Sequence, residues 1–365
     1  MRVTVTGANG FVGKNLIVYL QEQKNIQIDC VTRNTSETDL HEFLDRSDFV
    51  FHLAGENRPD SNDKFYLNNS NFTKKICSYF ISNNKKTPIL YTSSIQSSLD
   101  NDYGKSKKQA EEALESYAQS CDAQVFIYKL PNIFGKWSRP NYNSVVATFC
   151  YNVINNLPII NNAPEKVLEL VYVDDVIKAF GKVLKNLKFS EIEITYKITL
   201  RELEEQIKSF KEINQTHVTL RVGTGLTRAL YSTYLSFLNP SQFSYGLVKH
   251  EDPRGVFVEM LKTQDSGQFS YFTAHPGITR GGHYHHSKNE KFLVIKGKAR
   301  FGFRHILSNE YFEIITDGKN PEVVETVPGW THDITNIGTD EMIVMLWANE
   351  IFDRENPDTF ACKVK

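Results

Sequence analysis

The 365-residue sequence has no long apolar run and no excess of one charge. No window approaches the roughly 18 apolar residues that a membrane-spanning helix requires. Met1-Arg-Val-Thr-Val-Thr leads straight into a strand pattern, without a charged leader and an apolar stretch. Lysine and arginine total 42 against 43 aspartate and glutamate, which argues against a general nucleic-acid binder or a membrane-surface protein. We therefore expect a cytoplasmic protein whose partners include neither nucleic acid nor membrane.

Cysteine is sparse, and its spacing contains no CxxC pair. This spacing argues against a disulfide framework and a thiolate metal site, and it is typical of free thiols in a reducing compartment. The five cysteines are Cys30, Cys77, Cys121, Cys150 and Cys362. Internal repeats and low-complexity segments are also lacking. The chain exceeds the usual length of a single core, so two domains are expected.

The two halves of the chain differ in their pattern of predicted strands and helices. Residues 1–190 alternate short β-branched runs, such as Phe49-Val-Phe-His-Leu, with longer segments of helical spacing. This alternation predicts βαβ units and a largely parallel sheet. After about residue 245, short strand candidates follow one another between turn residues, which predicts an all-β barrel or sandwich. Residues 199–240 have a helical pattern early and a loop-like pattern later, and we expect them to join the halves.

A glycine-rich turn follows the first predicted strand. In Thr6-Gly-Ala-Asn-Gly-Phe-Val-Gly13, the glycines permit a tight turn and let backbone N–H groups approach a pyrophosphate at the positive end of the next helix. Tight βα turns also use glycine without a ligand, but the position at the first βα junction favours dinucleotide binding. The expected cofactor contacts are Gly7, Asn9, Gly10, Phe11, Val12 and Gly13.

Arg33 follows the second predicted strand, Gln27–Thr32. An acidic residue at this strand end would bind the ribose hydroxyls of NAD, whereas a guanidinium suits the 2′-phosphate of NADP. The alternative is a solvated surface arginine. Asp29 lies too early and alternates to the other face of the strand. We therefore expect NADPH as the cofactor.

Tyr103-Gly-Lys-Ser-Lys107 places a phenol and an ammonium at i and i+4, on one face of a helix. The ammonium stabilises the phenolate and so permits proton exchange with a substrate hydroxyl or carbonyl near neutral pH. A surface Tyr–Lys pair is the plain alternative. Ser94, just after the apolar strand Ile89–Thr92, adds a hydroxyl that can polarise a carbonyl. The glycine turn, the strand-end serine and the Tyr–Lys pair rarely coincide by chance.

Residues 1–240 resemble the extended short-chain dehydrogenase/reductase family of nucleotide-sugar epimerases, dehydratases and reductases. Further matching segments are Asp48-Phe-Val-Phe-His-Leu-Ala-Gly55, Leu130-Pro-Asn-Ile-Phe-Gly135 and Tyr172-Val-Asp-Asp-Val. The resemblance implies a Rossmann-like fold with cofactor contacts from Leu53, Ala54, Gly55 and Pro131. It also implies that Lys107 reaches the nicotinamide ribose and that Asn132 borders the nicotinamide and the substrate.

The sugar-nucleotide site of this family follows the sixth strand, at Lys136-Trp-Ser-Arg-Pro-Asn-Tyr-Asn143. Trp137 suits stacking on a base, and Arg139 suits a phosphate. A polar loop without a ligand is the alternative for each single residue. Only eight residues separate Ser94 from Tyr103, so the pocket beside Gln96 is expected to be open or closed by another segment. The expected substrate contacts are Gln96, Asn132, Lys136, Trp137, Arg139 and Asn143.

Four potential metal ligands lie in the second half of the chain. His283 and His285 are two apart, so on a strand they point the same way, and Glu290 falls on the next strand. His332 follows Pro328-Gly329 downstream. Imidazole and carboxylate donors suit zinc, iron, nickel or manganese. The spacing predicts a divalent metal site, with zinc as the first candidate, and places His286 on the opposite face.

The spacing of these ligands matches both cupin motifs, so residues from about 245 to 365 resemble a cupin. Pro328 and Gly329 are adjacent, where the second motif normally separates them, so the turn before His332 is expected to differ. Asp252-Pro-Arg-Gly-Val-Phe-Val-Glu resembles the opening of cupin-type deoxysugar epimerases, which generally work without metal. The metal therefore either polarises a keto oxygen or holds the barrel together. We divide the chain into a reductase domain at 1–243 and a cupin domain at 244–365.

The combination of a reductase with a cupin is similar, over essentially all 365 residues, to the bifunctional capsular polysaccharide enzymes of the CapF family. Close segments are Lys136-Trp-Ser-Arg-Pro, Tyr231-Ser-Thr-Tyr and His285-His-Ser-Lys-Asn-Glu290. The resemblance implies synthesis of UDP-2-acetamido-2,6-dideoxy-L-talose, a precursor of N-acetyl-L-fucosamine, and it implies a homodimer. The cupin would epimerise C3 of a UDP-4-keto-6-deoxy-N-acetylhexosamine, and the reductase would reduce C4. The candidate bases for C3 are His286, Lys291 and a hydroxide held by the metal.

Two other functions stay open. In the first, only the reductase is active and the cupin is a structural or dimerisation module. In the second, the chain is a non-enzymatic NADPH sensor, although a sensor has no need of Ser94, Tyr103 and Lys107. The metal, the order of the two reactions and the destination, capsule or lipopolysaccharide, are not fixed by the sequence.

Overall fold

A computed structural model describes residues 1–365 as two compact units. The first unit comprises residues 1–208 and 225–238, and the second comprises residues 209–224 and 239–365. The division into domains at 1–243 and 244–365 stays a prediction. No helix in the structure combines the length and apolar character needed to cross a membrane.

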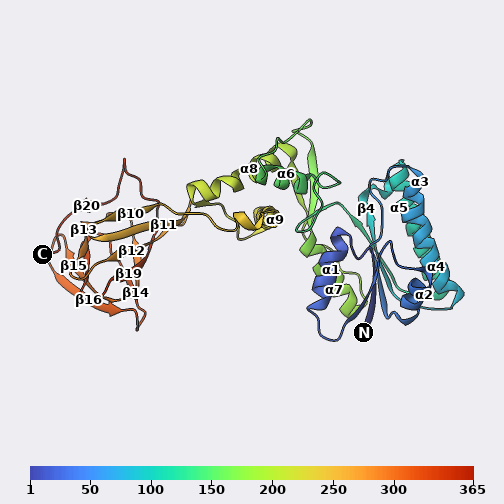
Figure 1. Cartoon of the computed structure of the whole chain (residues 1–365), viewed down its shortest axis with the longest axis horizontal. Helices are drawn as coiled ribbons and strands as arrows, with labels where there is room; N and C mark the ends of the chain where they lie inside the picture. Colours follow the sequence, from blue (N-terminus) through green and yellow to red (C-terminus); the bar gives the residue numbers. More distant parts are fainter. The chain divides into compact units, whose positions relative to one another are not determined.

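The first unit contains a parallel five-stranded sheet of order β2-β1-β3-β4-β5. Its strands are β1 (Arg2–Thr6), β2 (Gln27–Val31), β3 (Phe49–His52), β4 (Ile89–Ser94) and β5 (Val125–Leu130). Helices α1 (Phe11–Gln21) and α7 (Val173–Asn186) cover one face, and α2 (Glu37–Arg46), α4 (Phe72–Ser82) and α5 (Asp102–Cys121) cover the other (Figure 1). This arrangement confirms the predicted Rossmann-like fold.

The covered faces explain the apolar strands of this sheet. Phe49, Val50 and Phe51 of β3 are all 0% exposed, because helices bury both faces and leave no solvent side for alternation. Phe49 and Phe51 pack with α1 and α7, whereas Val50 packs with α2, α4 and α5. A short helix α3 (Asp63–Phe65) and a π-helical turn η1 (Tyr66–Asn71) lead into α4, and a 3₁₀ turn η2 (Ile95–Ser98) follows β4.

The remaining strands and helices of the first unit follow β5 in the sequence. They include a three-stranded sheet of β6 (Asn132–Phe134), β7 (Val167–Tyr172) and β8 (Tyr196–Thr199), together with α6 (Val145–Ile154) and α9 (Gly225–Leu235). Helix α8 (Leu200–Thr216) crosses the division between the units. The expectation of a loop late in residues 199–240 is wrong for α9. Ala229, Leu230, Thr233 and Tyr234 are buried at helical spacing there.

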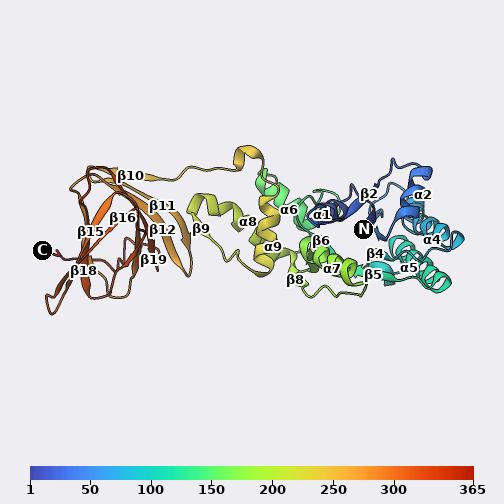
Figure 2. The same ribbon diagram turned by 90° about the horizontal axis from the view of Figure 1, so that it is seen from below.

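The second unit is a mostly antiparallel β barrel with a cupin-like fold, as predicted. One sheet has the order β10-β11-β12-β19-β14-β17, with β9 paired to β11, and the other has the order β16-β15-β18-β13-β20. Apolar side chains from the two sheets form one core, including Phe272, Phe292 and Phe301. Figure 2 shows the two sheets as the walls of this unit.

The strands of the second unit follow one another with few interruptions. A 3₁₀ turn η3 (Pro240–Gln242) precedes most of them. They are β9 (Val218–Thr219), β10 (Lys249–Asp252), β11 (Gly255–Thr263), β12 (Gly267–Ala274), β13 (Thr279–Tyr284), β14 (Glu290–Lys296), β15 (Lys298–His305), β16 (Tyr311–Asp317), β17 (Val323–Glu325), β18 (Trp330–Asn336), β19 (Met342–Ala348) and β20 (Phe360–Ala361).

Candidate functional site

The glycine turn between β1 and α1 packs directly against the end of β3. Gly7 has a φ of +69°, and a Cβ added there would lie 2.8 Å from the backbone nitrogen of Ala54. A Cβ on Gly13 would lie 2.3 Å from the carbonyl oxygen of Gly7. Gly10 precedes the first residue of α1 and no side chain caps the helix there, so its first-turn N–H groups are free to meet an anion. This geometry fits the pyrophosphate of a dinucleotide.

Arg33 lies two residues after the end of β2, with 85% of its side chain exposed. Its Nη2 donates to Glu56 Oε2 at 2.6 Å, and the hydroxyl of Tyr142 donates to Glu56 Oε1 at 2.9 Å. No sequence motif indicated Glu56, although it directly follows Ala54-Gly55. The carboxylate holds one nitrogen of Arg33 and leaves the rest of the guanidinium open to a phosphate.

Ser94, Tyr103 and Lys107 come from the end of β4 and the first turns of α5. The side chain of Asn101 accepts from the Gly104 N–H at 2.7 Å and so begins the helix immediately before Tyr103. Burial raises the pKa of Tyr103, and a hydrogen bond with Ser94 partly opposes this rise. The structure therefore places the predicted phenol beside the predicted strand-end hydroxyl.

Lys107 is 4% exposed, and its Nζ donates to the carbonyl oxygen of Thr92 at 3.0 Å. It also lies 4.9 Å from the ring centre of Tyr91. Burial lowers the pKa of Lys107 to about 8, and the carboxylate of Glu111 opposes this shift. A proton can therefore leave this ammonium near neutral pH.

The end of β3 brings the cofactor segment to the Tyr–Lys pair. A Cβ added to Gly55 would lie 3.1 Å from Lys107 Nζ and 3.1 Å from Asn69 Oδ1. Asn69, on the π-helical turn η1, accepts from the Glu56 N–H at 2.8 Å and donates to Ser106 Oγ at 2.9 Å. Its amide joins the residues after β3 to α5, a role that no local motif indicated.

The predicted substrate segment, residues 136–143, makes two hydrogen bonds to residues near the predicted cofactor site. Asn15 of α1 donates to the carbonyl oxygen of Lys136 at 3.1 Å, and Tyr142 donates to Glu56 as described above. Lys136 Nζ lies 2.5 Å from Asp174 Oδ1, and Arg139 lies over the ring of Tyr142. The remaining predicted substrate contacts are exposed residues: Gln96, Asn132, Trp137 and Asn143.

The four predicted metal ligands converge in the barrel. His283 on β13 pairs in register with His332 on β18, His285 follows β13, and Glu290 begins β14. Their ligand atoms all lie within 4.8 Å of one another. Both ring nitrogens of His332 are buried without a hydrogen-bond partner, and its Nε2 lies 3.4 Å from Glu290 Oε2. A buried imidazole that makes no hydrogen bond fits a divalent metal, which would supply the missing contact.

A cavity of about 190 Å³ opens onto this cluster. Three of the four ligands line it, and so does Arg280, whose Nε donates to the carbonyl oxygen of Thr273 at 3.0 Å. Arg280 Nη2 is buried without a partner, and the guanidinium lies 5.4 Å from the ring centre of Phe272. The cavity therefore combines three of the candidate metal ligands with one unsatisfied cationic donor.

Comparison with known proteins decides the family. The model of the NAD-dependent epimerase/dehydratase family matches residues 3–198, and that of the polysaccharide biosynthesis C-terminal domain matches residues 250–360. The chain is 57% identical to the UDP-2-acetamido-2,6-beta-L-arabino-hexul-4-ose reductase of Pseudomonas aeruginosa, over 100% of this chain and 99% of that protein. The crystal structure of the capsular polysaccharide assembling protein CapF from Staphylococcus aureus matches with a TM-score of 0.93 and 41% identity, covering 100% of both chains. The chain belongs to the CapF family.

More distant structures share only part of this CapF-family chain. A UDP-glucuronic acid 4-epimerase from Bacillus cereus, solved with NAD, matches 65% of the chain and 98% of its own length at 15% identity and a TM-score of 0.55. That likeness concerns the fold alone. It agrees with the Rossmann-like sheet of the first unit.

The two side-chain candidates for the base of this CapF-family cupin lie outside the cavity. His286 is exposed and its ring contacts Phe360, with the ring centres 4.8 Å apart. Lys291 Nζ pairs with Glu325 at 2.5 Å, and Lys291 is exposed. Neither residue lines the cavity, so the geometry supports neither as the base. No sequence motif indicated Arg280, although it directly precedes Gly281-Gly282-His283.

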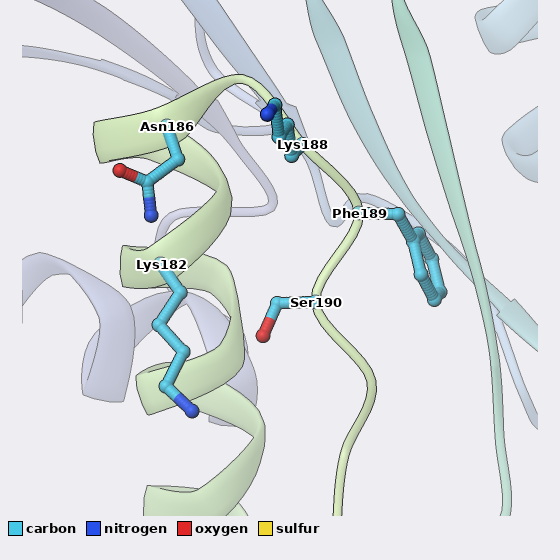
Figure 3. Close-up of a pocket in the computed structure, with 5 residues that line it drawn as sticks. All are labelled: Lys182, Asn186, Lys188, Phe189 and Ser190. Atoms are coloured by element: carbon cyan, nitrogen blue, oxygen red, sulfur yellow. The ribbon is translucent and has the colours of Figure 1, made fainter.

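A larger cavity of about 460 Å³ lies in the first unit, over the C-terminal half of α7 and the segment that follows it. Figure 3 shows its five lining residues, with Lys182 and Asn186 on α7 and the ring of Phe189 directed away from them. None of the predicted site residues lines it. Lys182 Nζ already pairs with Glu193 at 3.1 Å. The larger cavity therefore plays no part in the candidate site.

Proposed function

We propose that this chain is a bifunctional nucleotide-sugar enzyme that acts on a UDP-4-keto-6-deoxy-N-acetylhexosamine. The second unit epimerises C3, and the first unit reduces the C4 ketone with NADPH. The relative from Pseudomonas aeruginosa bears the name of a reductase acting on a UDP-linked hexul-4-ose. The observation that carries the proposal is the hydrogen bond between Ser94 and Tyr103, one helical turn from Lys107, whose Nζ lies against the cofactor segment at Gly55.

In the reductase step, NADPH when bound supplies the hydride that converts the C4 ketone to an alcohol. Ser94 donates a hydrogen bond to the C4 oxygen and Tyr103 gives its phenolic proton to that oxygen as negative charge develops. The positive charge of Lys107 stabilises the phenolate that Tyr103 becomes when it gives up its proton. Arg33 selects NADPH by binding the 2′-phosphate, with Glu56 fixing one of its nitrogens.

In the cupin step, a base removes the C3 proton, which the neighbouring ketone makes acidic, and the proton returns on the other face. His283, His285, Glu290 and His332 would hold a divalent metal, and that metal would supply Lewis-acid polarisation of the keto oxygen. Arg280 offers its unpartnered N–H to the same oxygen as negative charge develops on it. We assign no side chain as the base.

The product of the two steps is UDP-2-acetamido-2,6-dideoxy-L-talose, a precursor of N-acetyl-L-fucosamine for surface polysaccharide. We place this synthesis in the cytoplasm, where the nucleotide sugars are made, and assign a homodimer as the working assembly. Zinc is the first candidate for the metal, because three imidazoles and one carboxylate form a donor set that it favours.

The test mixes the chain with NADPH and the UDP-4-keto sugar, follows nicotinamide absorbance and determines the C3 configuration of the product by NMR. The proposal predicts NADPH oxidation and a talo product. The Glu290→Gln variant should give no talo product. Oxidation to the same talo product by both proteins would make the cupin a structural or dimerisation module. No oxidation with any keto sugar would favour the NADPH sensor.

A further inference from the structure

The C-terminal segment lies along the strand that carries two of the metal ligands. Strand β20 pairs antiparallel with β13, so that Ala361 lies opposite His283 and Phe360 lies opposite Tyr284. The Cys362 N–H also donates to the carbonyl oxygen of Gly282 at 2.9 Å. These ladder bonds bring Asp358, two residues before β20, to the turn between β13 and β14.

The Asp358 carboxylate accepts from three successive backbone N–H groups of that turn. The N–H of His286 donates to Oδ1 at 2.9 Å, and those of Ser287 and Lys288 each donate to Oδ2 at 2.7 Å. The hydroxyl of Ser287 donates to Oδ2 at 2.9 Å as well. Hydrogen bonds to an ionised acceptor are stronger than neutral ones, so one side chain fixes the path of the whole turn.

The backbone of the same residue orients a predicted ligand. His285 Nδ1 makes a short hydrogen bond to the carbonyl oxygen of Asp358, in which a carbonyl can only accept. Nδ1 therefore carries a proton, and in the neutral imidazole this tautomer places the lone pair on Nε2, the atom that lies 3.3 Å from Glu290 Oε2 inside the cluster. A metal needs this tautomer if it is to bind Nε2.

The turn also supports a second ligand. Lys288, whose N–H donates to Asp358, is 8% exposed, and its Nζ lies 3.1 Å from Glu290 Oε1. The ammonium holds one carboxylate oxygen and leaves the other among the histidines. Asp358 thus reaches His285 directly and Glu290 through Lys288.

We infer that Asp358 is a positioning residue for the metal, and that it couples the C-terminal segment to metal affinity. The inference rests on the metal site proposed above. Residues that orient metal ligands typically change metal affinity by about 10- to 100-fold when replaced. Asparagine at this position keeps the shape but replaces one acceptor oxygen with an N–H₂ group that faces N–H donors.

The test compares wild-type protein with the Asp358→Asn variant by competition for Zn²⁺ against a chromophoric chelator, and records the Co²⁺ absorption spectrum of each. We expect the variant to bind Zn²⁺ about 10- to 100-fold more weakly and to show a changed Co²⁺ spectrum. Asp353→Asn is the matched control, because Asp353 is an exposed acid of the same segment that accepts from the Glu355 N–H. Ser287→Ala, which removes a single contact, should have a smaller effect.

Thermal unfolding with and without Zn²⁺ separates a positioning role from a merely structural one. Positioning predicts a smaller stabilisation by Zn²⁺ in the variant than in the wild type. An equal fall in both conditions, with unchanged Zn²⁺ affinity, would overturn the inference while leaving the metal site intact. Failure of the wild-type protein to bind Zn²⁺ or Co²⁺ would overturn the metal site and the inference together.

Discussion

The two units place their predicted ligand-binding groups in opposite surroundings. In the first unit the side chains proposed to meet the cofactor phosphate and the substrate base lie open: Arg33 has 85% of its side chain exposed, and Trp137 is 46% exposed. In the barrel, Glu290 is 6% and His332 is 4% exposed. A large dinucleotide and a sugar nucleotide must enter and leave, so their site consists of backbone turns and an open rim. The proposed metal is a small ion that can be enclosed, and its candidate site consists of largely buried side chains that converge from three strands.

The comparison predicts different consequences of substitution. A change at the open site alters ligand binding or chemistry and spares the fold. A change at the enclosed site also disturbs buried charges, because Glu290 pairs with Lys288 at 3.1 Å and lies close to two imidazoles. Substitutions at one site should therefore leave the activity of the other site intact.

The largest effect is expected for Tyr103→Phe. Losing the proton donor should slow NADPH oxidation by about 10²- to 10⁴-fold, while C3 proton exchange continues in the barrel. Nicotinamide absorbance measures the first, and deuterium incorporation followed by NMR measures the second. Tyr66→Phe is the control, because its hydroxyl donates to Asp102, one residue away from Tyr103. Loss of C3 exchange in a folded Tyr103→Phe protein would contradict the division of labour.

Glu290→Gln should produce the reverse pattern. Removing the charged ligand should weaken Zn²⁺ binding by at least about 10-fold and abolish C3 exchange. NADPH oxidation of a keto sugar already epimerised at C3 should persist. Metal content after dialysis and the two activities check this prediction. Loss of both activities in a protein with an unchanged circular dichroism spectrum would show that the sites do not act separately.

Arg33→Ala should affect only cofactor choice. Without the guanidinium, the KM for NADPH should rise by about 10-fold or more, as expected when a charge-assisted contact is lost, and the KM for NADH should change little. Arg58→Ala, an exposed arginine two residues after Glu56, should leave both constants unchanged. Steady-state kinetics with each cofactor provides the measurement. Equal rises for NADPH and NADH in Arg33→Ala would exclude recognition of the 2′-phosphate.

The smallest expected effect is a shift in pH dependence. Burial lowers the pKa of Lys107 to about 8, and Glu111 opposes that shift. NADPH oxidation should therefore decline above about pH 8 as the ammonium loses its proton. The contribution of Lys107 to the free energy of unfolding has the opposite trend. It rises from about pH 8 to the ordinary lysine pKa, because the folded state favours the neutral amine.

Glu111→Gln sharpens this prediction. Removing the carboxylate charge should move the decline in kcat/KM to lower pH, because the remaining effect of burial lowers the pKa of Lys107 further. A pH–rate profile of both proteins measures the shift. A decline at the same pH in both would show that Glu111 does not act on Lys107.

Local patterns predicted much of the site. The glycine turn, the Tyr–Lys pair and the His283–His285 pair each lie within a few residues of sequence, so their geometry follows from one turn, one helix or one strand. His332 lies on a different strand and was predicted from its resemblance to the second cupin motif. Ser94 and Tyr103 were brought together as expected, and so were His283, His285, Glu290 and His332. The βα alternation and the later succession of short strands were sufficient to predict both folds.

The residues that the sequence did not reveal act through contacts made far along the chain. Glu56 meets Tyr142 across 86 positions, and Asp358 meets His286 across 72. No period or spacing encodes such pairs, because tertiary folding alone brings them together. The position of His286 is a related case. Its adjacency to His285 placed it on the opposite face of the strand, and the structure exposes it there, away from the cavity.

The most direct test of the two-site account is proton exchange without reduction. The full chain is incubated in D₂O with the UDP-4-keto-6-deoxy-N-acetylhexosamine and Zn²⁺, without NADPH, and the C3 proton is followed by NMR. The account predicts deuterium at C3 before any cofactor is added, and nicotinamide oxidation only after NADPH is supplied. A C3 proton that stays intact without NADPH, together with a reduced product of unchanged C3 configuration after its addition, would contradict the account.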